Sequence, residues 1–306
     1  MDVTLWQRRF GEHLLARGYA SRTVDGHLRE LPHFFAFLEQ LGVTSLAGVT
    51  RSLLADYRNV LFYHKYRGKP LSLGTQSSRM QAILLFARYL LREDYLLLDI
   101  TNGLELPRLS KGLPRMVLSE PETLRLLERP DVSMPKGVRD RTILEVLYGT
   151  GIRNTEMCDL LLDQVDFDRQ LLRIDHGKGD KARVVPFGEE AQIWLEEYIF
   201  KIRPTLLREH TDRLFLTMKG SVFIRHTLAR LVSYWARKAG LEKHVTPHVL
   251  RHSYATHMLR RGAGLRHLQM LLGHESSQTT ERYTRVEVSD LRKVLHRCHP
   301  REGRKS

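Results

Sequence analysis

Apolar residues recur at helical spacing through the first hundred positions of the chain. The pattern predicts helices near Thr4–Arg17, Ser52–Tyr66 and Thr75–Leu91, and another that follows Ser21 as its N-cap. The last of these is expected to run without a break through Val24, Leu28, Leu31, Phe35 and Leu38. No strand-like alternation interrupts the helices, so this region is predicted to be a small all-α domain.

The periodicity stops in the segment TNGLELPRLSKGLPRM, which contains two prolines and two glycines. Such a composition is typical of a linker between domains. We therefore predict an N-terminal domain over residues 1–106, a linker over 107–117 and a second domain over 118–306.

The second domain is predicted to be helical with a small β-hairpin. It opens on LSEPE, where Ser119 and Glu122 form a capping box at the start of a helix. Two short apolar runs, Leu171–Ile174 and Val184–Val185, flank a Gly-Lys-Gly-Asp-Lys turn and predict the hairpin. The remaining helices are expected at Val138–Tyr148, Thr155–Leu161, Glu189–Lys201, Arg225–Ala239, and from Leu250 to the end.

Charge narrows the class of partner. The chain of 306 residues has a formal net charge of +14, and both predicted domains are basic. A polyanion such as nucleic acid is the first candidate for a partner, although a basic surface can also serve solubility alone. No run of eighteen apolar residues predicts a membrane span, and two cysteines suit a reducing cytoplasm.

Four segments combine reactive residue types with turn residues, and the first two contribute an arginine and a lysine. In YGTGIRNTEM, Gly149 and Gly151 are expected to end one helix just before Arg153, which begins the next. An arginine at a helix N-terminus suits phosphate binding, but a salt bridge to Glu156 explains it equally well. In HGKGDKARVVP, Lys178 lies at the predicted hairpin tip, where a merely solvated lysine is the simpler interpretation.

The third segment, TPHVLRHSYATHML, places His248 and Arg251 three residues apart on one helical face. Arginine offers a planar fork to phosphate oxygens, and histidine can exchange a proton near neutral pH. A zinc site would need His252 and His257 as well, but the spacing does not bring three of these histidines to one face.

The fourth segment, LLGHESSQTTERYTRV, contains His274 and Tyr283 after a helix that Gly273 is expected to end. A tyrosine becomes a useful nucleophile where cations stabilise the group that it attacks, although most tyrosines are structural. A metal site at Asp163, Asp166 and Asp168 is the alternative chemistry. Aspartates are common in turns, so a turn is the better interpretation of these three.

Taken in order, these segments resemble the tyrosine recombinase (phage integrase) family over almost the whole chain. GTGIRNTEM is similar to the first arginine box of the family, HGKGDKARVVP to its lysine hairpin, TPHVLRHSYATHML to its His-x-x-Arg box, and LLGHESSQTTERY to its final box. The resemblance implies catalytic roles for six residues: Arg153, Lys178, His248, Arg251, His274 and the nucleophile Tyr283.

The resemblance also implies a mechanism, a fold and partners. Tyr283 would form a 3′-phosphotyrosyl bond with DNA, without ATP, a metal or another cofactor. The fold would be mainly α, with a SAM-like core-binding domain and a catalytic domain that carries a small β-sheet. Expected partners are double-stranded DNA with an inverted-repeat core site, and three further subunits in a homo-tetramer, or a hetero-tetramer with a second recombinase.

Two further expectations follow from the same resemblance. The apolar face of the last helix (Val288, Leu291, Val294 and Leu295) would dock on a neighbouring subunit rather than pack within its own. Because the helices begin close to Met1, an Xer-like recombinase is favoured over one with an additional arm-binding domain. Two alternatives remain open at this stage: an architectural DNA-binding relative without strand exchange, and a relative of type IB topoisomerases.

Overall fold

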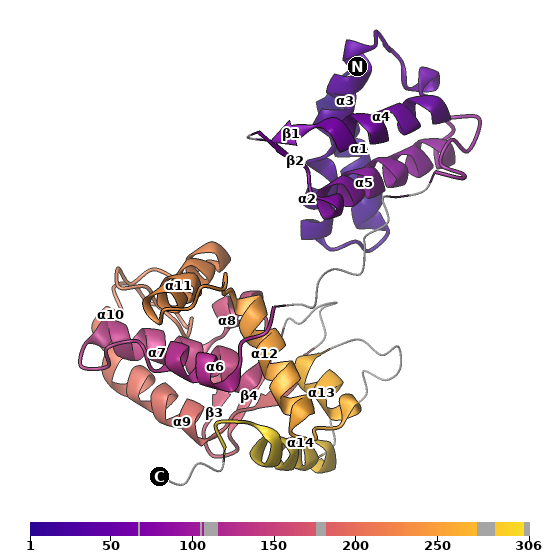
Figure 1. The fold of residues 1–306 in the computed structure, drawn as a ribbon. Coiled ribbons are helices and arrows are strands. Elements are labelled where there is room, and N and C mark those ends of the chain that lie inside the picture. The colour runs from indigo at the N-terminus through magenta and orange to yellow at the C-terminus, as the bar shows by residue number, and fades with distance from the viewer. Residues whose placement is uncertain (67, 105, 107–115, 176–181, 274–284, 303–306) are drawn as a thin grey trace. The chain divides into compact units, whose positions relative to one another are not determined.

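The computed structural model describes residues 1–66, 68–104, 106, 116–175, 182–273 and 285–302, with the backbone alone for 285–287. The chain divides into two compact units, Met1–Leu113 and Pro114–Ser306 (Figure 1). Each unit has its own hydrophobic core. Within the described ranges, no helix combines the length and the apolar character needed to cross a membrane.

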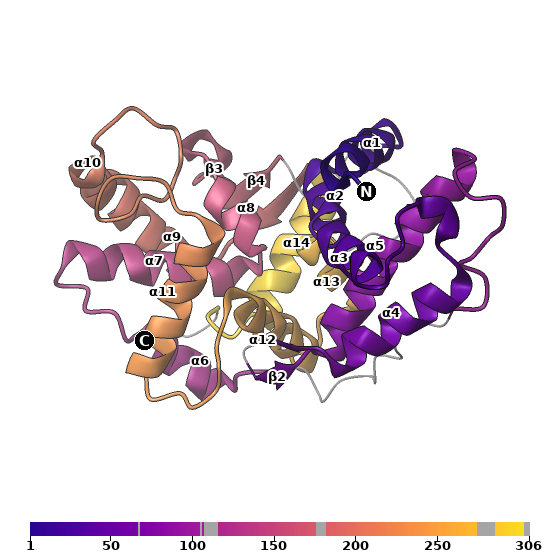
Figure 2. The same ribbon diagram turned by 90° about the horizontal axis from the view of Figure 1, so that it is seen from above.

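The N-terminal unit is a helical bundle, and the view from above shows α1 to α5 gathered together (Figure 2). Its elements are α1 (Val3–Ala16), α2 (Ser21–Leu28), α3 (Leu31–Gln40), the 3-10 turn η1 (Leu46–Gly48), α4 (Arg51–Tyr63), β1 (Lys65–Tyr66), β2 (Lys69–Pro70) and α5 (Leu73–Arg92). Apolar side chains on the inner faces of these helices are buried, among them Phe10, Phe34 and Phe86. The expected helices are therefore present.

Two details of this unit differ from the sequence-based expectation. The helix expected to follow Ser21 without a break is two helices, because Pro32 lies in the first turn of α3, where its missing N–H costs no hydrogen bond. Ser21 is the first residue of α2 rather than its N-cap. The unit also contains two short antiparallel strands, β1 and β2. Each has only two residues, which is too few to show an alternating pattern in the sequence.

The C-terminal unit is built around α7, in which every residue from Gly137 to Thr150 is buried. Its helices are α6 (Glu120–Leu127), α7 (Pro135–Thr150), α8 (Asn154–Asp159), η2 (Leu162–Gln164), α9 (Glu189–Glu196), the π-helical η3 (Glu197–Ile202), α10 (Arg203–Leu206), α11 (Arg225–Lys238), α12 (Pro247–Arg260), α13 (Leu265–Leu272) and α14 (Arg285–Cys298). The predicted capping box is present: Ser119 Oγ accepts from Glu122 N at 3.2 Å, and Glu122 Oε2 accepts from Ser119 N at 2.7 Å. The helix expected from Glu189 to Lys201 changes to π geometry halfway.

A small antiparallel sheet accompanies these helices. Strand β4 (Leu171–Ile174) pairs with β5 (Arg183–Pro186) on one side and with β3 (Val165–Asp166) on the other. The predicted hairpin is therefore confirmed, with one additional strand. Helices α13 and α14 pack against β5.

The last helix packs within its own unit, and its expected docking on a neighbouring subunit stays a prediction. Leu291, Val294 and Leu295 of α14 are buried in the core of their own unit. Val288, the fourth residue of this face, is half-buried, and α14 packs against α12, α13 and β5.

Candidate active site

Arg153 is presented by a sharp turn between α7 and α8. The turn needs Gly151, whose φ of 62° lies in the left-handed region. A Cβ there would also lie 2.6 Å from Cδ1 of Tyr254. Gly149, by contrast, stays within α7. Arg153 therefore becomes the N-cap of α8, one residue before the position expected from the sequence.

Glu156 holds Arg153 in place, as the salt-bridge interpretation required. Its Oε1 accepts from Arg153 Nη1 at 2.7 Å, and its Oε2 accepts from the backbone N–H of Arg153 at 2.7 Å. The same carboxylate accepts two bonds of 2.8 Å from Arg183 on β5. Burial alone would raise the pKa of Glu156, but the hydrogen bonds and charge of Arg183, together with Arg153, lower it to about 2. Glu156 is thus a buried, ionised anchor for two guanidinium groups.

Arg251 approaches from the opposite side, on α12. Thr246 caps this helix and Pro247 occupies its first turn, so Arg251 lies one turn inside. Its Nη1 donates to the carbonyl oxygen of Gly151 at 2.5 Å, and its Nη2 donates to that of Leu272 at 2.7 Å. Burial and then the charge of Arg153 lower the pKa of Arg251 to about 10, so the group remains protonated at neutral pH.

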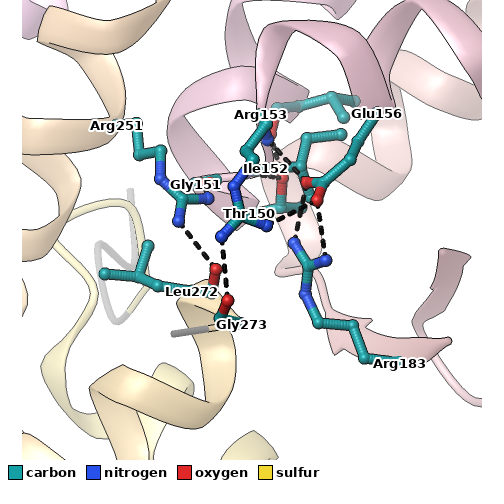
Figure 3. A network of polar contacts seen from close by, with 10 residues as sticks. Thr150, Gly151, Ile152, Arg153, Glu156, Arg183, Arg251, Leu272 and Gly273 are labelled. Carbon is teal, nitrogen blue, oxygen red and sulfur yellow. Dashed lines mark hydrogen bonds and ion pairs between the residues drawn. The ribbon is translucent and has the colours of Figure 1, made fainter. Parts of the chain in front are cut away.

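The two predicted arginines meet at the C-terminal end of α13. Arg153 Nη2 donates to the carbonyl oxygen of Gly273 at 2.8 Å, next to the Leu272 carbonyl that Arg251 contacts (Figure 3). Gly273 ends α13 with a φ of 62°, as the sequence predicted. Two cationic forks, 98 residues apart in sequence, therefore converge on the turn that leads to residue 274.

His248 lies at the start of α12 and is exposed. It is one helical turn from Arg251, and its ring centroid lies 6.1 Å from that of His252. Lys178, His274 and Tyr283 lie outside the described residues. Their described flanks are β4 and β5 for Lys178, Gly273 for His274, and α14 for Tyr283.

Residues that suggested a zinc site or an acidic metal site have structural roles. His257 uses both ring nitrogens on protein atoms, the Tyr148 hydroxyl and the Leu118 carbonyl oxygen, each at 2.8 Å. In the acidic turn, Asp166 accepts from the backbone N–H of Arg169, and Asp163 pairs with Arg173. Within the described part of the chain, no group of three potential ligands is arranged to hold a metal ion.

Arg183 is the residue of this site that the sequence analysis missed. It occupies an inward position of β5 and is 5% exposed. A charged side chain that shares a strand face with buried Val185 was the available signal, because such a charge requires a buried partner. The sequence could not name Glu156 as that partner, since the two residues are 27 positions apart.

Comparison with known proteins places the chain in one family. Residues 116–289 match the phage integrase family. The chain is 39% identical to "Tyrosine recombinase XerC 2" of Ralstonia nicotianae over 97% of this chain and 86% of the relative. It is 40% identical to "Tyrosine recombinase XerD" of Pseudomonas putida over 94% of both chains.

Solved structures agree on the fold. A XerH site-specific recombinase bound to its difH substrate matches 97% of this chain and 82% of its own, with a TM-score of 0.68 and 22% identity. A lambda integrase dimer bound to a core site matches 93% of this chain and 100% of its own, with a TM-score of 0.69 and 17% identity. At these identities the two structures support the architecture alone.

Proposed function

This chain belongs to the phage integrase family and is a DNA strand-transferring tyrosine recombinase, and on that premise we propose that Tyr283 is its nucleophile. Tyr283 would attack a DNA phosphate, form a 3′-phosphotyrosyl bond and release a 5′-hydroxyl. A hydroxyl from the partner strand would then reverse the step on the new junction. The bond energy is kept in the phosphotyrosine, so neither ATP nor a metal is needed.

The convergence of Arg153 and Arg251 is the observation that supports this proposal. Each guanidinium carries five N–H donors, and two of them are used in the bonds described above. Both forks lie beside the turn that leads to His274, the next residue of the proposed site. Fixed cationic donors of this kind stabilise a phosphorane-like transition state without reorganising during the reaction.

The other proposed roles follow from chemistry and position in the chain. Lys178 would protonate the leaving 5′-oxygen, and His274 would join the arginines around the phosphate. His248 would assist proton transfer, since its exposed ring at the start of α12 is accessible to a ligand. Together with the two arginines and Tyr283, these three residues complete the proposed catalytic set of six.

We propose double-stranded DNA with an inverted-repeat core site as the substrate and a tetramer as the working assembly. The basic charge and the fold shared with DNA-bound recombinases support the substrate. The tetramer contains this chain alone or this chain with a second recombinase. Because Leu291, Val294 and Leu295 are buried in their own unit, the predicted docking of α14 on a neighbouring subunit would require exchange of this helix or use of its remaining surface, which includes half-buried Val288.

A suicide substrate tests the proposed chemistry. The probe is a library of duplexes with randomised inverted half-sites, first selected for binding to the full chain, each with a nick that lets the severed piece diffuse away. We expect a covalent protein–DNA adduct that Tyr283→Phe abolishes, and a loss on the order of 10²–10³ in its rate of formation for Arg153→Ala.

The same assay separates the alternatives. Binding without any adduct would contradict the proposal and favour an architectural protein. An adduct that relaxes supercoiled circles but never joins two duplexes would favour a topoisomerase. Arg173→Ala is the matched control, because Arg173 is a half-exposed arginine of β4 whose carboxylate partners lie outside the proposed site.

A further inference from the structure

Arg183 is a buried arginine that is not one of the six proposed catalytic residues. Its two terminal nitrogens donate to the two oxygens of Glu156, each at 2.8 Å, which is the bidentate geometry that only a planar fork allows. Its side chain is 4% exposed and that of Glu156 is 2% exposed. A pair this buried is costly to leave incomplete, because removal of one partner strands a charge.

The position of Arg183 connects three segments of the proposed active site. It follows residues 176–181, which include Lys178, at the start of β5. Through Glu156 it reaches Arg153, which binds the opposite edge of the same carboxylate (Figure 3). A Cβ on Gly273 would lie 2.9 Å from Arg183 Nε, so the arginine packs directly under the turn before His274.

The shared carboxylate makes the position of Arg153 depend on Arg183. Glu156 Oε1 accepts one bond from each arginine, and Arg153 also reaches outward to Gly273. Without Arg183, Glu156 would have Arg153 as its remaining guanidinium partner. Arg153 would then be drawn inward, and its charge would be neutralised by the carboxylate rather than directed to the phosphate.

We propose that Arg183 is a positioning residue that keeps Arg153 directed at the scissile phosphate. This inference rests on the proposed function, because it presupposes that Arg153 binds that phosphate. Arg183 acts through Glu156 and does not itself need to contact DNA.

The test compares two suicide substrates, one with an ordinary scissile phosphodiester and one with a methylphosphonate at the same position. A methylphosphonate lacks one charged oxygen, so it depends less on an arginine that neutralises charge. We expect Arg183→Met to slow adduct formation on the order of 10²-fold with the phosphodiester and clearly less with the methylphosphonate. Arg153→Ala should likewise lose less rate with the methylphosphonate than with the phosphodiester. Lys178→Ala, which affects the leaving group, should lose the same factor with both substrates.

A second variant covers the possibility that Arg183→Met does not fold. Arg183→Lys keeps the positive charge but cannot span both oxygens of Glu156. It should therefore also form the adduct slowly with the phosphodiester, and its loss of rate should be smaller with the methylphosphonate. Thermal unfolding and DNA binding of each variant are measured alongside. Arg173→Met, which removes an exposed arginine from the neighbouring strand, should cleave both substrates at the wild-type rate.

The outcomes separate this inference from the proposed function. If the wild type forms no adduct with DNA that it binds, the proposed function fails. If the wild type and Arg153→Ala behave as expected but Arg183→Lys cleaves at the wild-type rate, the positioning role alone is refuted. An equal loss on both substrates for a folded Arg183 variant would also overturn it, because a general structural defect has no reason to distinguish them.

Discussion

At the scale of single residues, the site depends on backbone conformations as much as on charges. Gly151 turns the chain so that Arg153 becomes the N-cap of α8, and the carbonyl oxygen of Gly151 accepts from Arg251. The sequence indicated a break at this point but did not distinguish Gly149 from Gly151. Only the packed structure does so, because Tyr254 fills the space that a side chain at 151 would need.

Gly151→Ala should therefore destabilise the protein by about 2–4 kcal/mol, from left-handed backbone strain together with overpacking. Denaturant unfolding measures this effect. Gly149→Ala is the matched control, since a Cβ there makes ordinary contact with Ala191 at 3.6 Å and alanine favours a helix. Equal stability of the two variants would contradict the packing described for the turn.

Glu156 gives a second residue-level prediction, on acid stability. Its pKa is about 2 in the folded protein against an ordinary value of 4.5. A lowered carboxyl pKa stabilises the fold at pH values above 4.5, and that stability is lost as the pH falls from 4.5 towards 2. We expect a loss on the order of 3 kcal/mol across this range. Glu156→Gln should flatten that part of a stability–pH curve, and an unchanged curve would show that the carboxylate is not the anchor.

At the scale of elements, most helices follow directly from local patterns. A capping box was sufficient to predict the start of α6, and two short apolar runs around a glycine-containing turn were sufficient to predict the β4–β5 hairpin. The split between α2 and α3 and the π-helical stretch were missed. A proline in a first turn does not interrupt the apolar spacing around it, and π geometry depends on packing rather than on local sequence.

The segment that follows α14 should make stability depend on pH, through His299. His299 is buried against Tyr148 and Tyr254, and burial lowers its pKa to about 3 from 6.5. The unfolded chain binds a proton at this residue near pH 6.5, whereas the folded chain resists it until about pH 3. Stability should therefore fall as the pH decreases through this range.

Replacement of His299 with a neutral side chain tests this effect. His299→Gln should have a shallower decline in unfolding free energy between pH 6.5 and 4.5, a window above that of Glu156. His267→Gln, at a position where the side chain is half-buried on α13, is the control for the loss of an imidazole as such. Parallel curves for the wild type and His299→Gln would refute the buried neutral histidine.

At the scale of the whole molecule, the sequence was sufficient to identify the family. It could not supply the pairing of Arg183 with Glu156, or the packing of α14 in its own unit. Both depend on contacts between segments distant in sequence. Local patterns constrain them only weakly, because a buried charge or an apolar face does not identify its own partner.

The charge of the whole chain predicts steep salt dependence of DNA binding. A chain of net charge +14 that contacts many phosphates should lose affinity with a slope of about −5 or steeper in log K against log salt. Titration of a labelled duplex at several salt concentrations measures it. A slope close to zero would contradict an interface made chiefly with the DNA backbone.

Peptide mapping of the covalent adduct tests the central claim most directly. The adduct from the suicide substrate is digested with protease and nuclease, and mass spectrometry locates the residue that carries the 3′-nucleotide phosphate. We predict that this residue is Tyr283. A phosphate on any other residue, or an adduct that persists in Tyr283→Phe, would contradict the proposed chemistry.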